Sequence, residues 1–267
     1  MEGLLSKDYA RSRVKEIDWE QNDPNVLPGD PYPFQKSNPI NPYKEFIKQM
    51  DTVSVSYNTP LKSTSDEFID DDFYLGTTSI QAADKDGWVV SITPSGGWVP
   101  AVIAGNTGVG LSQRMQSFVL KEEENPFNVV EPGKRPRATL TPSMALKDGK
   151  PHISFAIQGG DSQDQNSLQF FLNMVEYDMN VQEAVEAANI NSFQMKGSFG
   201  EHETRPGVLL LREDTPVWTR RALSKMGYKL QFRDRTSGPM NAIFFDYEQG
   251  SMWGGSSNYG EDYGIGW

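Results

Sequence analysis

The residues best suited to chemistry are Thr77 and Thr78, which follow Gly76 where an acidic segment meets a sequence typical of a β-strand. A threonine hydroxyl is a weak nucleophile without a base, and no histidine or lysine is suitably placed here. Cleavage of the Gly76–Thr77 bond would free the α-amine of Thr77, whose pKa of about 7.7–8.0 makes it a usable base. Thr77 would then supply nucleophile and base together. Two threonines at a strand start are also ordinary β-sheet composition, so the pair alone does not decide the matter.

Composition excludes several other kinds of site. The chain has no cysteine, and its two histidines are His152 and His202, so thiolate chemistry is excluded and a histidine-built zinc site is disfavoured. The segment 105–110, GNTGVG, lacks the Gly-Lys-Ser/Thr ending of a phosphate loop. The acidic runs 70–72 and 122–124 are interpreted as solvated surface. We therefore expect no cofactor and no metal.

The net charge of −11 over 267 residues disfavours binding to a phosphate backbone, so no nucleic-acid partner is expected. The sequence shows no apolar run long enough to span a membrane, and its first residues resemble an amphipathic helix and not an export signal. No membrane insertion is expected, and the compartment stays open.

The chain consists of two regions that differ in composition. Residues 1–76 combine a short helix with a stretch rich in Pro, Asn and Asp and an acidic stretch before Gly76, which predict an extended connector and an exposed linker. Residues 77–267 alternate strand pairs with helices. The segment 77–93 predicts a hairpin closed by an Asp-Gly turn, and 143–157 repeats this design. Paired strands with helices inserted between them predict an α+β layered fold.

Three helices are predicted after the second hairpin. The first follows Gly159 and Gly160, with Asp161 or Ser162 as its cap. Its predicted buried face is Leu168, Phe171, Leu172 and Val175, and the second helix shows the same spacing at Val181, Ala184, Val185 and Ala188. The third follows Thr215 and Pro216 and ends at Gly227. The glycine-rich tail from residue 250 is interpreted as an irregular arm.

Several of these segments, in order, resemble one known family. GTTSIQAADKDGWVVSITPSGGW, PGKRPRATLTPSMALKDGKPHISFAIQGGDSQDQ and NVQEAVEAA together resemble the gamma-glutamyltranspeptidase family of N-terminal-nucleophile hydrolases. The resemblance implies a four-layer αββα sandwich and a precursor that cuts itself in two. It also implies that residues 1–76 end a large subunit and residues 77–267 form the small, catalytic subunit. The Gly76–Thr77 bond would then be the autocleavage site, and Thr77 the catalytic nucleophile.

The resemblance also assigns roles around Thr77. Gly159 and Gly160 match the glycine pair whose backbone N–H groups form an oxyanion hole. Thr139 matches a hydroxyl that contacts a substrate carboxylate, and Ser95 matches the hydroxyl that hydrogen-bonds the nucleophile.

Several positions depart from the glutathione-cleaving members, including Ala138 in place of a serine and Thr78-Ser79 in place of Thr-His. Gly97 replaces an asparagine, Ser117 stands near the aspartate that binds the glutamyl α-ammonium, and Arg114 stands where a neighbouring polar or acidic ligand is found. An ammonium group without its carboxylate partner loses a contact worth about 1.5–3 kcal/mol, and an arginine repels it. The TPSGGW and GGDSQDQ forms resemble a side branch with acylase-like and oxamate-amidohydrolase-like members. Arg114 would suit an acidic amide that lacks an ammonium.

The resemblance supports an autoprocessed threonine amidohydrolase or acylase that cleaves a small-molecule amide through a threonine acyl-enzyme. One alternative is a gamma-glutamyltransferase or glutathione hydrolase. Another is a silent fragment that needs a partner, because the chain resembles only the later part of a family precursor. We therefore expect the sandwich to be incomplete in this chain, with an N-terminal large-subunit region as its missing partner.

Overall fold

The computed structural model describes all residues except 26, 38, 47, 49–75, 97–101 and 259–261. The acidic linker and Gly97 lie outside the described residues. Within the described part of the chain, no helix is long and apolar enough to cross a membrane.

The centre of the fold is a four-stranded antiparallel sheet in the order β3-β4-β8-β9. Its strands are β3 (Ser143–Lys147), β4 (Lys150–Ile157), β8 (Met240–Asp246) and β9 (Ser251–Ser256). The β3–β4 hairpin turns at Asp148 and Gly149, both with positive φ, as predicted from the Asp-Gly pair. The predicted hairpin at 143–157 is therefore confirmed.

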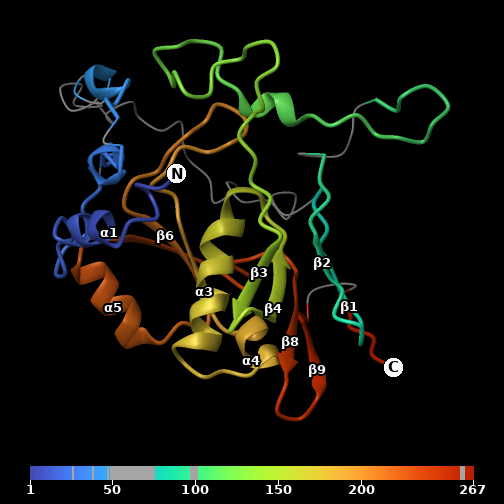
Figure 1. Ribbon diagram of the computed structural model, residues 1–267. Helices are drawn as coiled ribbons and strands as arrows, with labels where there is room; N and C mark the ends of the chain where they lie inside the picture. The colour runs from blue at the N-terminus through green and yellow to red at the C-terminus, as the bar shows by residue number, and fades with distance from the viewer. Residues whose placement is uncertain (26, 38, 47, 49–75, 97–101, 259–261) are drawn as a thin grey trace.

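One face of this sheet is covered by two helices, α3 (Gln163–Val175) and α4 (Val181–Glu186) (Figure 1). Alternate residues of β4 point to these helices and are almost fully buried. This apolar core contains Ile153, Phe155, Ile157, Phe170, Val181, Ala184, Val185, Met240 and Ala242. Helix α4 begins with a capping box, in which Asn180 and Glu183 exchange side-chain and backbone hydrogen bonds.

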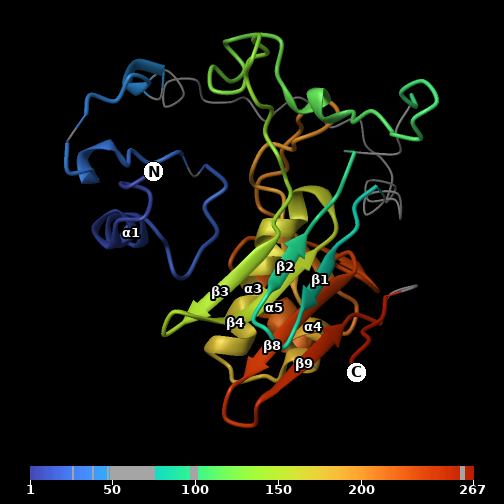
Figure 2. The ribbon, with the colours of Figure 1, turned by 45° about the vertical axis from the view of Figure 1, so that its right-hand side comes forward.

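The opposite face carries the hairpin of β1 (Ile80–Ala83) and β2 (Val89–Ile92), which lies across β4 and β8 (Figure 2). The predicted hairpin at 77–93 is confirmed, and Asp84 closes its turn by accepting bonds from the N–H groups of Asp86 and Trp88. The helices, the sheet and the hairpin give three successive layers, α, β and β. The outward-facing side chains of the hairpin, Ile80, Val90 and Ile92, remain 49, 42 and 47% exposed.

A third sheet lies beside these layers, in the order β5-β6-β7. It contains β5 (Ile190–Ser192), β6 (Val208–Arg212) and β7 (Lys229–Arg233), with α5 (Val217–Lys225) between β6 and β7. The N-terminal segment contains α1 (Lys7–Val14) and the short 3-10 helix Tyr32–Phe34. Backbone and side-chain bonds from Asn22 to Met226 and from Gln194 to Pro24, each 2.7 Å long, attach this segment to the rest.

The structure corrects three sequence expectations. The tail is not an irregular arm throughout, because residues 251–256 form β9 and pair with β8. Helix α3 exposes Leu168, Leu172 and Val175 and instead buries Gln163, Asn166, Ser167 and Phe170. Neither Asp161 nor Ser162 caps α3 through its side chain, because both are engaged with other partners.

Candidate active site

Thr77 lies at the open end of the β1–β2 hairpin. It forms an isolated antiparallel bridge with Ser95, and its hydroxyl donates to Ser95 Oγ at 3.1 Å. The N–H of Thr78 donates to the Pro94 carbonyl oxygen at 3.0 Å. Asn241 of β8 donates to both the carbonyl oxygen and Oγ of buried Ser79, each at 3.0 Å. The start of the hairpin is therefore fixed to the central sheet two residues after Thr77.

Arg114 opens a 3-10 helix, Arg114–Ser117, and connects Ser95 to Thr139. Its guanidinium donates to Ser95 Oγ and to Thr139 Oγ1, each at 3.3 Å, and lies 5.4 Å from the centre of the Phe199 ring. Among the described residues, no carboxylate forms a salt bridge with Arg114. Burial lowers the pKa of Arg114 from its ordinary value, and the charge of Asp161 opposes that change. A partly buried cation held mainly by neutral groups is suited to bind an anion from solution.

Gly159 and Gly160 lie between β4 and α3. Their φ angles are +122° and +49°, a region that side-chain-bearing residues rarely adopt. The carbonyl oxygen of Gly159 accepts bonds from the N–H and Oγ of Ser162, which fixes the turn. The turn continues through a 3-10 helix, Gly160–Ser162, into α3, so the pair stands at a helix start, which favours negative charge.

Thr139 is 9% exposed and is held from two sides. Arg114 donates to its hydroxyl, and Gln163 Nε2, with its amide oriented to donate, lies 3.1 Å from the carbonyl oxygens of Thr139 and of Ile157. Gln163 is fully buried at the first position of α3. Thr139 is thereby tied to the end of β4, where Gly159 and Gly160 follow.

The structure thus connects four of the residues singled out from the sequence, Thr77, Ser95, Arg114 and Thr139, by a chain of hydrogen bonds. Gly160 joins them through Phe199, because a Cβ at Gly160 would lie 3.5 Å from the Phe199 ring. Ser117 lies on the same 3-10 helix as Arg114 but is fully buried, and its Oγ has no hydrogen-bond partner among the described residues. Gly97 lies outside the described residues.

Sequence reasoning missed Phe199 and the role of Asp161. The Asp161 carboxylate accepts from the N–H and Oγ of Ser198, at 2.7 and 2.5 Å, and lies 3.4 Å from Arg137. These contacts hold Phe199 against Gly160 and Arg114. The sequence offered one signal, an acidic residue directly after the glycine pair, and it was interpreted as a helix cap.

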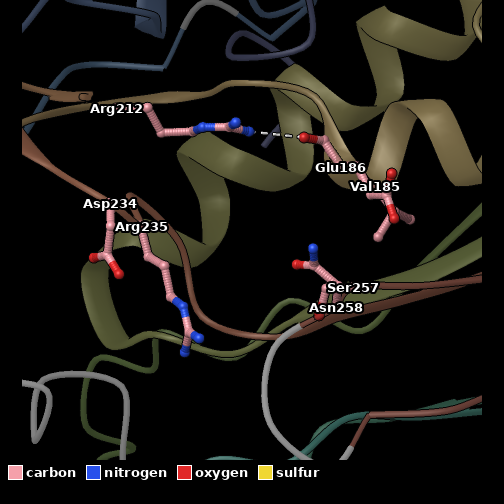
Figure 3. Close-up of a pocket in the computed structure, with 7 residues that line it drawn as sticks. All are labelled: Val185, Glu186, Arg212, Asp234, Arg235, Ser257 and Asn258. Carbon is pink, nitrogen blue, oxygen red and sulfur yellow. Dashed lines mark hydrogen bonds between the residues drawn. The ribbon is translucent and has the colours of Figure 1, made fainter. Parts of the chain in front are cut away.

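A separate polar cavity of about 350 Å³ lies beyond α4, lined by Val185, Glu186, Arg212, Asp234, Arg235, Ser257 and Asn258 (Figure 3). Arg212 donates to the Glu186 carbonyl oxygen across it at 2.9 Å. None of the site residues named above lines this cavity. Within the described ranges, no group of three His, Asp or Glu side chains could hold a metal ion.

The sequence matches the Gamma-glutamyltranspeptidase family over residues 1–267. The chain belongs to this family. The glutathione hydrolase proenzyme of Bacillus subtilis (strain 168) is 27% identical over 274 residues, which cover 99% of this chain and 40% of that proenzyme. The acylase ACY 1 proenzyme of Pseudomonas sp. (strain SE83) is 32% identical over 174 residues, which cover 64% of this chain and 28% of that proenzyme.

The fold comparison agrees with the family. The crystal structure of a cephalosporin acylase from Bacillus halodurans aligns with a TM-score of 0.71 and 24% identity, over 100% of this chain and 39% of that chain. The fold is therefore the α+β fold of the N-terminal nucleophile hydrolases. The chain spans less than half the length of the relatives named above.

Proposed function

We propose that this chain carries the catalytic centre of an autoprocessed threonine amidohydrolase, with Thr77 as nucleophile. The observation that carries the proposal is the hydrogen-bond chain from Thr77 through Ser95 and Arg114 to Thr139. It joins a threonine preceded by glycine to a cationic side chain beside a glycine turn at a helix start. Membership of the gamma-glutamyltranspeptidase family supports this reading.

In the proposed reaction, cleavage of the Gly76–Thr77 bond first frees the Thr77 amine. Gly76 is exposed with a positive φ and has no side chain to obstruct attack on its carbonyl carbon. In each later turnover, Thr77 Oγ1 attacks the substrate carbonyl carbon while the amine takes the hydroxyl proton. The N–H groups of Gly159 and Gly160 stabilise the oxyanion, the amine product leaves with a proton, and water releases the acid.

We propose that the acyl part of the substrate carries a carboxylate and lacks an α-ammonium. Arg114 and Thr139 would bind that carboxylate, since the guanidinium has no salt-bridge partner among the described residues. A charge-assisted contact of this kind contributes about 1.5–3 kcal/mol. Ser117, which is buried and uncharged, offers no anion to a γ-glutamyl ammonium.

The second candidate is γ-glutamyl transfer or glutathione hydrolysis. It is favoured by the proenzyme of Bacillus subtilis, which aligns with 99% of this chain. The identities of Gly97, Arg114 and Ser117 distinguish the two candidates, because none of the three residues offers a carboxylate to an α-ammonium.

We further propose that the apolar outer side of the β1–β2 hairpin is covered by a large-subunit region. Ile80, Val90 and Ile92 form this face and remain about half exposed, in a family whose sandwich is expected to have a fourth layer. Activity that appears only when the chain is combined with that region would support the silent-fragment alternative, whereas activity of the chain alone would rule it out.

The test uses two matched substrates, glutaryl-p-nitroanilide and γ-glutamyl-p-nitroanilide, which differ by one α-ammonium. The proposal expects faster release of p-nitroaniline from the glutaryl compound, no release by Thr77→Ala and near-normal release by Thr78→Ala. Comparable or faster release from the γ-glutamyl compound would favour the second candidate. Hydrolysis by Thr77→Ala would refute both candidates.

A further inference from the structure

Arg137 lies two residues before Thr139 and forms an ion pair with the carboxylate that follows the glycine turn. One nitrogen of its guanidinium lies 3.4 Å from Asp161 Oδ1, and a second donates to the carbonyl oxygen of Lys196 at 2.9 Å. The pair is partly exposed, since 37% of the Arg137 side chain and 26% of the Asp161 side chain remain accessible. Arg137 therefore places a positive charge against a carboxylate at the edge of the candidate active site.

Asp161 also acts on a second cation, Arg114. Burial lowers the pKa of Arg114, and the negative charge of Asp161 opposes that change. Asp161 therefore lies close enough to Arg114 for their charges to interact, although the two do not form a salt bridge. The same carboxylate repels any anion that Arg114 binds, because like charges repel across a short, partly desolvated distance. A nearby cation that offsets the charge of Asp161 would reduce this repulsion.

The Asp161 carboxylate keeps its place without Arg137. It accepts hydrogen bonds from the N–H and Oγ of Ser198, at 2.7 and 2.5 Å, and Ser198 is only 1% exposed. Loss of the guanidinium would leave these two donors in position. Removing the side chain of Arg137 should therefore change the charge around Asp161 more than it changes the position of the carboxylate.

The backbone of Arg137 is also held independently of its side chain. Its N–H donates to Asn128 Oδ1 at 3.3 Å, and the side-chain N–H of Asn128 donates to the carbonyl oxygen of Ser117. Ser117 ends the 3-10 helix that Arg114 begins. A change of the Arg137 side chain should therefore preserve the connection between this helix and the segment that leads to Thr139.

We propose that Arg137 determines the specificity of the site for an acidic acyl group: by pairing with Asp161, it leaves the charge of Arg114 to a substrate carboxylate. The ligand class is the monoamide of a dicarboxylic acid and the acid released from it. This inference rests on the proposed amidohydrolase function for the identity of the anion. Arg137 acts through Asp161, and its contribution is electrostatic.

The test measures the binding of glutarate to the full wild-type chain by titration calorimetry. Glutarate is the acid that the proposed reaction releases from a glutaryl amide, so the measurement does not depend on turnover. Arg137→Gln is expected to weaken glutarate binding about fivefold, the upper end for a partly exposed ion pair. This loss should shrink at about 1 M salt, where charges are screened beyond about 3 Å.

Further variants separate charge from shape. Asp161→Asn keeps an acceptor for Ser198 but removes the negative charge, so it should bind glutarate at least as tightly as the wild type. Combining it with Arg137→Gln should restore the binding that Arg137→Gln alone loses. Arg137→Lys keeps the charge and should bind nearly as tightly as the wild type. Arg135→Gln, which removes an exposed arginine from the same segment, is the matched control and leaves binding unchanged.

A purely structural role for the ion pair predicts the opposite result, with weaker binding in Asp161→Asn and a further loss in the double variant. That result, unchanged binding in Arg137→Gln, or no glutarate binding by the wild type would overturn the inference. If circular dichroism shows that either Asp161 variant does not fold, the comparison of Arg137→Gln with Arg137→Lys decides.

Hydrolysis of glutaryl-p-nitroanilide distinguishes this inference from the proposed function. Thr77-dependent hydrolysis without an effect of Arg137 on glutarate binding refutes this inference alone. Glutarate binding that depends on Arg137 as described, without any hydrolysis, refutes the proposed function and leaves the anion site in place.

Discussion

The two faces of the central sheet are built in different ways. On the face towards α3 and α4, Ile153, Phe155 and Ile157 pack into an apolar core. On the face towards β1 and β2, where Ala156 and Phe245 are also buried, polar side chains add hydrogen bonds to the hairpin: Ser154 donates to Gln81 at 2.6 Å, and Asn241 donates twice to Ser79. Both faces belong to the same strands, with alternate side chains on each.

The two kinds of contact contribute differently: apolar packing mainly stabilises the fold, and hydrogen bonds mainly fix the relative position of the strands. Apolar packing stabilises strongly but has no direction, so it holds the layers together without fixing a register. Hydrogen bonds contribute less net free energy but require particular atoms at particular distances. The strand that leads from Thr77 is attached to the sheet by hydrogen bonds as well as by packing, so its position relative to the sheet is defined by particular atoms.

The largest effect on stability is expected from the apolar face. Ile153→Ala should lower the free energy of unfolding by about 2–5 kcal/mol, because it leaves a cavity in a fully buried position. Urea unfolding measures this loss. Ile40→Ala, at a position 90% exposed, is the control and should change stability by less than about 0.5 kcal/mol. Equal losses of unfolding free energy in Ile153→Ala and Ile40→Ala would contradict the conclusion that the apolar face stabilises the fold.

On the hydrogen-bonded face, the larger effect should fall on activity. Asn241→Leu removes both bonds to Ser79 and should slow cleavage of the Gly76–Thr77 bond about tenfold, equivalent to about 1.4 kcal/mol in the barrier. The time course of cleavage, followed by mass spectrometry, gives the rate. Asn106→Leu, in an exposed turn, should leave it unchanged. A loss of stability as large as that of Ile153→Ala would contradict the assigned role.

A smaller effect should come from the Ser154–Gln81 pair. Ser154→Ala and Gln81→Leu are each expected to destabilise the fold, while the double variant should lose less than their sum, with a coupling of about 1 kcal/mol. Urea unfolding of all four proteins completes the cycle. Additive losses would show that this contact contributes nothing specific to the attachment of the hairpin.

The smallest effect concerns His152, at the bulge where the β3–β4 register shifts. Burial, and then the charge of Lys147, lowers the pKa of His152 below its ordinary value. The unfolded chain therefore binds this proton more tightly, so stability should fall as the pH drops through about 6.5 and below. The slope of unfolding free energy against pH measures this, and His152→Gln should flatten it. An unchanged slope in the variant would contradict the assignment.

The sequence predicted the positions of helices and strands better than it predicted which side chains of a helix are buried. Helix α4 buries Val181, Ala184 and Val185 as their spacing indicated, because a short helix against a sheet follows its apolar stripe. Ala188, predicted on the same face, is exposed because the helix ends at Glu186. Helix α3 does not, since its first turn buries Gln163 and Asn166 next to Thr139 and the glycine turn. In α3, the polar contacts next to the glycine turn decide which side chains are buried, and the apolar spacing of the sequence does not.

The tail shows a similar limit. Glycine favours irregular structure, yet Gly255 lies in β9, where a Cβ would come within 2.9 Å of Val181. The glycine permits α4 to approach the strand, and the local sequence does not reveal which element approaches.

Thr77, Gly159 and Gly160 were predicted as site residues from a family resemblance, and they stay a prediction. Phe199 could not be predicted, because its proximity to Gly160 depends on the path of the segment 193–205.

The most direct test is the mass of the purified chain with and without Thr77→Ala. The account predicts that the wild-type chain yields a fragment beginning at Thr77 and that the variant stays uncut at Gly76–Thr77. Cleavage of that bond in Thr77→Ala, or a wild-type chain that hydrolyses amides with the bond intact, would contradict it.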